Sequence, residues 1–161
     1  MEVREKGAEM KYTMIVLTGC LAVAGSATAQ EKKIKRSDLP AAVEKTVVAE
    51  SKGATIRGFS EEKEKGKTTY ELQMTVNGHS KDLQMDESGV VIEVEEQVAL
   101  EALPAEARTS LQAKAGRGRI TKVESITKKN RLVAYEAQVD TDGKKSEVQV
   151  GADGKPLDHE E

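Results

Sequence analysis

The sequence has little of what most often builds compact cores and catalytic sites. It contains no Trp, one Phe and 2% aromatic residues, so a core must rely on Val, Ile, Leu, Met and Ala. One Cys and two His leave few soft metal ligands or nucleophile–base pairs. The net charge of -3 gives no basic excess for nucleic acid.

The N-terminal region has the pattern of an export signal. Lys11 is followed by an apolar run at 12–25 and then by Ala27-Thr28-Ala29, the small-residue pattern of a signal-peptidase site. The run is too short to span a bilayer. We therefore predict that residues 1–29 are a signal peptide cleaved near Ala29, and that the protein is periplasmic or secreted.

Cys20 supports a second interpretation of this region. Leu17-Thr18-Gly19-Cys20 resembles a bacterial lipobox, whose Cys would carry a lipid anchor. Because the apolar run continues past Cys20, soluble export is favoured and the anchor is the minority alternative. Cleavage after Ala29 leaves no Cys and excludes disulfides. The start codon is open between Met1 and Met10, since the residues before Lys11 are partly acidic.

The rest of the chain repeats itself. Leu39-Pro40-Ala41 returns as Leu103-Pro104-Ala105, and Tyr70-Glu71-Leu72-Gln73 returns as Tyr135-Glu136-Ala137-Gln138. A repeat of this length indicates duplicated structural units. We predict a flexible leader at 30–36, a first repeat at 37–96 and a second at 97–161.

Each repeat has the pattern of one helix followed by four strands. Pro40 and Gly53 begin and end the first helix, and Pro104 and Ala115 bound the second. The alternation from Tyr70 to Val76 predicts a half-buried strand. Asn77-Gly78 and Asp142-Gly143 predict tight hairpins. The strands are expected at 54–61, 70–76, 83–85 and 90–94, then at 120–126, 133–139, 148–150 and around Leu157, with 93–102 linking the repeats.

These elements predict an α+β fold. Tandem helix-plus-four-strand units would form a continuous antiparallel sheet with the helices packed on one face. The helix start, the Tyr-Glu-x-Gln strand, the hairpins and the Asp/Gly turns, each occurring twice, resemble the PepSY-like family, which is related in fold to beta-lactamase inhibitor proteins. The resemblance covers 39–158. It implies an exported bacterial protein that inhibits or regulates a peptidase through the open face of its sheet.

The chain shows no catalytic set. His79 lies beside a hairpin and His159 lies near the end of the sequence, a spacing that does not form a ligand pair. No Gly-x-Ser-x-Gly elbow or P-loop is present. Asp140-x-Asp142-Gly143 is similar to a calcium loop, but Gln149 stands where that loop needs Glu. We predict no enzymatic activity, no cofactor and no metal site.

Polar residues occupy the strand positions that point away from the predicted helices, and they match between the repeats. A solvated sheet face explains them in part. The sharper hypothesis is a platform that hydrogen-bonds a partner. The candidate partner-binding residues are Glu71, Gln73, Asp82, Gln84, Glu136, Gln138, Glu147 and Gln149.

The sequence therefore predicts an exported protein-binding module, an inhibitor or regulator of an envelope enzyme such as a peptidase. The expected partner is a protein, with no nucleic acid and no membrane span. The alternative is an envelope protein that binds a small molecule or a metal on the same open face.

Overall fold

The computed structural model describes residues 30–64, 66–158 and 161, and shows one eight-stranded antiparallel sheet whose strand order follows the chain. The strands are β1 (Gln30–Ile34), β2 (Thr55–Glu64), β3 (Lys67–Val76), β4 (His79–Asp86), β5 (Val91–Gln97), β6 (Arg119–Lys128), β7 (Arg131–Thr141) and β8 (Lys144–Gly151). The helices are α1 (Ala41–Glu50) and α2 (Ala105–Ala115), with 3-10 turns at Arg36–Asp38 and Leu100–Ala102. The predicted α+β class and the antiparallel sheet are confirmed.

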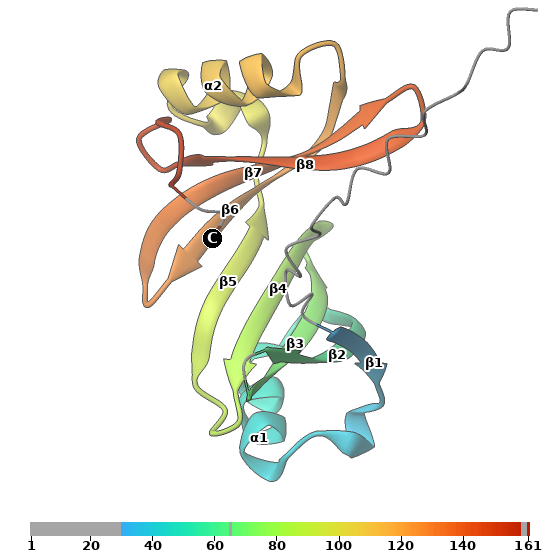
Figure 1. Ribbon diagram of the computed structural model, residues 1–161. Coiled ribbons are helices and arrows are strands. Elements are labelled where there is room, and N and C mark those ends of the chain that lie inside the picture. Colours follow the sequence, from blue (N-terminus) through green and yellow to red (C-terminus); the bar gives the residue numbers. More distant parts are fainter. Residues whose placement is uncertain (1–29, 65, 159–160) are drawn as a thin grey trace, which may run out of the picture.

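The sheet is bent, and the two helices lie at its opposite ends (Figure 1). α1 packs beneath β3 and β4, whereas α2 packs over β7 and β8. The β5–β6 pair joins the two ends, so residues 93–97 of the expected linker are sheet. No helix in the described part of the chain is long and apolar enough to cross a bilayer.

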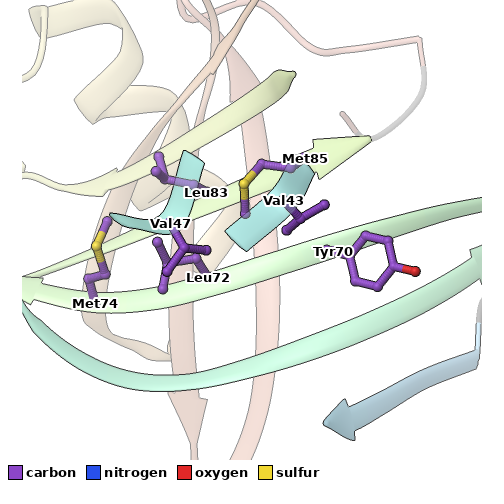
Figure 2. Packing of buried hydrophobic residues seen from close by; sticks show 7 residues of the cluster. All are labelled: Val43, Val47, Tyr70, Leu72, Met74, Leu83 and Met85. Carbon is purple, nitrogen blue, oxygen red and sulfur yellow. The ribbon is translucent and has the colours of Figure 1, made fainter. Parts of the chain in front are cut away.

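α1 covers the first of two apolar cores (Figure 2). Val43 and Val47, one helical turn apart, are fully buried against Leu72 and Leu83. In β3 the alternate side chains of Tyr70, Leu72 and Met74 are buried and Val76 is half-buried, which confirms the predicted alternation. The second core packs Leu103, Ala107 and Leu111 against the strands in the same way, although with smaller side chains.

The leader is predicted to be flexible, and this prediction is wrong. β1 pairs with β2, with Ile34 opposite Phe59. Ile34 packs against the first core, and Arg36 binds Glu44 of α1 at 2.7 Å. A single apolar residue and an ion pair are enough to hold this charged segment on the edge of an existing sheet, where unpaired backbone groups are ready to bond.

The fourth strand of each repeat also differs from expectation. A register shift opposite Gln84 and Met85 turns Val91 and Val94 toward the core, and leaves Val90 57% exposed. Around Leu157 no strand forms in the described residues. Instead the chain turns back, and the backbone N–H of Gly151 donates to the carbonyl of Lys155 at 2.8 Å.

The turn between β6 and β7 carries residual strain. Lys129 and Asn130 adopt φ of 51° and 60°, a conformation that Asn-Gly adopts more easily. The double substitution Lys129→Asn/Asn130→Gly should therefore raise the free energy of unfolding by about 0.5–1 kcal/mol. Urea unfolding measures this change. An unchanged or lower unfolding midpoint would contradict the expectation.

Candidate partner-binding face

The sheet has one face that neither helix covers, which we call the open face. It lies on the inner side of the bend, whereas the helices lie on the outer side (Figure 1). All eight predicted site residues lie on it, because each alternates with a core residue such as Leu72 or Ala137. The sequence pattern therefore predicted which strand positions lie on the open face, and partner binding by these residues stays a prediction.

The predicted residues form four direct cross-strand pairs. Glu71 lies opposite Gln84 and Gln73 opposite Asp82 in β3 and β4. The matching pairs in β7 and β8 are Glu136 with Gln149 and Gln138 with Glu147. We call the four predicted residues of β3 and β4 the first quartet and the four of β7 and β8 the second quartet. β5 and β6 lie between the two quartets, so the quartets do not form one compact site.

The strands between the quartets carry polar residues that sequence reasoning missed. They are Glu93, Glu95, Lys122, Glu124 and Lys128. The prediction assigned 93–102 to a linker, although Glu93-Val94-Glu95 already alternates as a strand would. That alternation is the signal that could have located the centre of the face.

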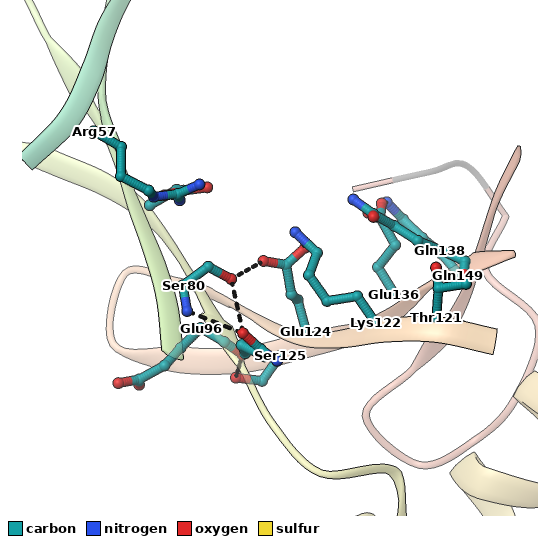
Figure 3. A network of polar contacts seen from close by, with 12 residues as sticks. Arg57, Ser80, Glu96, Thr121, Lys122, Glu124, Ser125, Glu136, Gln138 and Gln149 are labelled. Atoms are coloured by element: carbon teal, nitrogen blue, oxygen red, sulfur yellow. Dashed lines mark hydrogen bonds and ion pairs between the residues drawn. The ribbon is translucent and has the colours of Figure 1, made fainter. Parts of the chain in front are cut away.

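Glu124 is the most deeply buried carboxylate of this centre, at 2% exposure. The Lys122 ammonium lies 2.6 Å from it, and the Ser80 hydroxyl donates to it at 3.0 Å (Figure 3). The Arg57 guanidinium of β2 lies 2.6 Å from Asp82 of β4, across the intervening strand β3. These contacts supply the carboxylates of Glu124 and Asp82 with ion-pair or hydrogen-bond partners from within the protein.

Within the described ranges, the hydrogen-bond donors to the Glu71 carboxylate are neutral. The Ser60 hydroxyl donates to it at 2.7 Å, and the Gln73 amide donates at 3.1 Å. Burial nevertheless raises the pKa of the Glu71 carboxyl above its ordinary value, because desolvation outweighs these bonds. Its negative charge is therefore incompletely compensated.

Glu95 is the most perturbed carboxylate of the open face. Burial raises its pKa to about 8, and the nearby charges of Glu124 and Glu136 add to the effect. Carboxylate oxygens of Asp82, Glu95 and Glu124 lie within 4.8 Å of one another. Such oxygens are ligands that hard cations prefer, and the sequence did not reveal this grouping.

Glu161, at the end of the described chain, contacts the second quartet. The Gln149 side-chain amide donates to Glu136 at 2.8 Å, and the backbone N–H of Glu161 donates to the side-chain Oε1 of Gln149 at 2.9 Å. Lys128 lies 3.2 Å from the Glu161 carboxylate and 3.4 Å from Glu93. The polar side chains at this end of the open face therefore form hydrogen bonds and ion pairs with one another and with Glu161.

The histidines and the calcium-loop-like segment form no common site in the described residues. His79 is exposed at the β3–β4 hairpin, and His159 lies outside the described residues. Asp140 accepts a hydrogen bond from the Gly143 backbone at 2.8 Å, and Asp142 lies 3.3 Å from Arg117. The calcium-loop-like segment thus closes a hairpin.

Three solved structures share this fold. A protein from Bacteroides eggerthii DSM 20697, provisionally described as periplasmic, matches with a TM-score of 0.58 and 15% identity over 74% of this chain and 86% of its own. A DUF2874 family protein from Bacteroides ovatus ATCC 8483 gives 0.55 and 16% over 74% and 84%. A BLIP-like protein from Bacteroides fragilis NCTC 9343 gives 0.50 and 18% over 72% and 81%.

These likenesses show a BLIP-like fold, as the resemblance to beta-lactamase inhibitor proteins implied. No family model matches the chain, and no curated protein matches it. The PepSY-like assignment therefore stays a prediction.

Proposed function

We propose that this chain is an exported protein-binding module whose open face binds, and inhibits or regulates, an envelope enzyme such as a peptidase. One observation carries the proposal. The open face partly buries the carboxylates of Glu71 and Glu95, which form no ion pair with a cation among the described residues, at a cost in stability that the fold alone does not require. A binding partner that supplies hydrogen-bond donors or cations would compensate them.

Export is part of the proposal. The predicted signal peptide, residues 1–29, lies outside the described residues. Cleavage near Ala29 would leave Gln30, where β1 begins, as the first residue, so the whole sheet would stay with the exported protein. The fold is shared with the Bacteroides eggerthii protein that is provisionally described as periplasmic, which supports this compartment.

We also propose that the protein consists of two tandem units of one ancestral motif. Gly89 and Gly154 occupy matching turns, and both have φ of +79°. A Cβ on Gly89 would meet the backbone of Ala42 in α1, and a Cβ on Gly154 would meet the backbone of Ala107 in α2. The same close approach at the start of both helices supports common ancestry.

The first test is affinity capture from the envelope fraction with the exported protein as bait, followed by assay of the captured enzyme. The exported protein should inhibit or alter the activity of that enzyme. The variant Glu71→Lys/Glu136→Lys should capture much less of that enzyme, because the new lysines would repel cationic groups of the partner.

Glu50→Lys is the control for this experiment. Glu50 is exposed at the end of α1, away from the open face, and lysine is favourable at a helix C-terminus. The control should retain full recovery. Unchanged recovery with the open-face variant, or a captured enzyme whose activity does not respond to the protein, would refute the proposal.

The alternative of a small-molecule- or metal-binding protein has one observation in its favour, the approach of Asp82, Glu95 and Glu124 within 4.8 Å. A thermal-shift screen separates the two functions. A ligand that binds only the native state raises the melting temperature. A concentration-dependent rise with a divalent cation, abolished by Glu95→Gln, would favour the alternative.

A further inference from the structure

The open face is hollowed over the first unit. The larger hollow, of about 190 Å³, is lined by Glu31, Ser60, Glu62, Thr69, Glu71 and Gln84. The smaller, of about 50 Å³, is lined by Glu71, Asp82, Gln84, Glu93 and Glu95. The two hollows are adjacent, because Glu71 and Gln84 line both. Together they extend across β1 to β5, and we call this pair of hollows the acidic groove.

The acidic groove has more carboxylates than cations. Six carboxylates line it, and no lysine or arginine is among its lining residues. Within the described part of the chain only Asp82 and Glu93 form ion pairs, with Arg57 at 2.6 Å and Lys128 at 3.4 Å. Of the remaining four, Glu95 is mostly protonated near neutral pH, because its pKa is about 8. Glu31, Glu62 and Glu71 leave a negative potential that a positively charged partner would meet.

The second unit does not repeat this arrangement. Lys122 lies 2.6 Å from Glu124. Burial raises the pKa of Glu136, the counterpart of Glu71, and the hydrogen bond from Gln149 and the charge of Lys122 oppose part of this rise. The hollow over this unit includes Lys145 beside Glu147. The two halves match in sequence, yet among the described residues lysines lie beside the carboxylates of the second unit, whereas no lysine or arginine lines the acidic groove of the first.

The extent of the acidic groove indicates the kind of occupant. It crosses five neighbouring strands, which span about 19 Å at the usual strand spacing. A single metal ion holds ligands within about 2.6 Å and would leave most of this surface unused. Several cationic side chains carried on one polypeptide would cover it.

We infer that the acidic groove receives lysine and arginine side chains from the contact surface of a partner protein. This inference rests on the proposed protein-binding function and specifies the chemistry of the partner. The raised pKa values of Glu71 and Glu95 agree with it, because a basic side chain would stabilise the charged form that burial disfavours.

The test uses a fluorescent, end-capped hexalysine peptide and fluorescence anisotropy with the exported protein. Hexalysine should bind, hexaglutamate should not, and binding should weaken as salt is raised to about 0.15 M. The variant Glu31→Gln/Glu62→Gln/Glu71→Gln should bind hexalysine about tenfold more weakly, as expected for three exposed or half-buried charge contacts.

A matched variant controls for net charge. Glu50→Gln/Glu101→Gln/Glu106→Gln removes the same number of charges from exposed residues outside the acidic groove. It should bind within about twofold of the unmodified protein, since distant exposed charges are screened. An equal loss of hexalysine affinity in the two variants would overturn the inference. Binding of hexaglutamate as tightly as hexalysine would also overturn it. Thermal unfolding verifies that both variants are folded.

The same variants separate this inference from the proposed function. An enzyme that is captured and regulated equally by the unmodified protein and by the groove variant would refute the acidic groove and leave the proposed function standing. Groove-specific hexalysine binding without any regulated enzyme would refute the proposed function and leave the acidic groove standing.

Discussion

Gly154→Ala is expected to lower the free energy of unfolding by about 3 kcal/mol. Gly154 has φ of +79°, which costs a residue with a Cβ about 1–2 kcal/mol. The added Cβ would also lie 2.6 Å from the Ala107 nitrogen and the Glu106 carbonyl carbon in the first turn of α2. Backbone atoms cannot rotate away, so α2 must shift and loosen the packing of Leu111. Urea unfolding measures the loss.

Gly89→Ala should behave in the same way in the first unit. Its Cβ would lie 2.5 Å from the Ala42 carbonyl oxygen, and the Thr46 hydroxyl already binds the Gly89 carbonyl at 2.7 Å. Gly143→Ala is the control, because Gly143 has φ of +82° but a Cβ added there would meet nothing within 4 Å. If the control loses as much stability as Gly89→Ala or Gly154→Ala, the contact with the helices is not the cause.

Sequence periodicity predicted the core because burial in this fold follows short-range rules. Tyr70, Leu72 and Met74 alternate in β3, and Val43 and Val47 share a helix face, so each pattern points inward without knowledge of the rest. Asn77-Gly78 likewise specifies its hairpin locally. The register shift at β5 could not be predicted in this way, because it depends on how two strands pair rather than on either strand alone.

The candidate site was predicted only in part, for the same reason. The repeat located the outer quartets, since matching positions such as Glu71 and Glu136 stand out in the sequence. It could not place Glu95 beside Glu124, because that proximity arises where the two units join. Nor could it show that Lys122 compensates one unit only. A sequence repeat predicts that matching residues occupy equivalent positions. Which carboxylates have a cation beside them depends on tertiary contacts, which the repeat does not specify.

Glu95→Gln is expected to stabilise the protein progressively as pH rises from about 4.5 to about 8, with the full gain above pH 8 and little change near pH 5. The pKa of Glu95 is about 8 in the folded protein, against an ordinary value of 4.5. Between these values the folded state binds more protons than the unfolded state, so the contribution of Glu95 to stability falls as pH rises through this window. Glutamine resembles the protonated carboxyl and does not titrate.

The gain in the free energy of unfolding at pH 8.5 should be about 1–2 kcal/mol, because Glu95 is only half-buried and solvent screens part of the effect. Urea unfolding at pH 5 and pH 8.5 gives the two values. Glu93→Gln is the control, since Glu93 lies 3.4 Å from Lys128 and loses an attraction when neutralised. A difference between Glu95→Gln and the unmodified protein that does not change with pH would mean that Glu95 is charged throughout, and that the neighbouring carboxylates Glu124 and Glu136 do not act on it as the geometry requires.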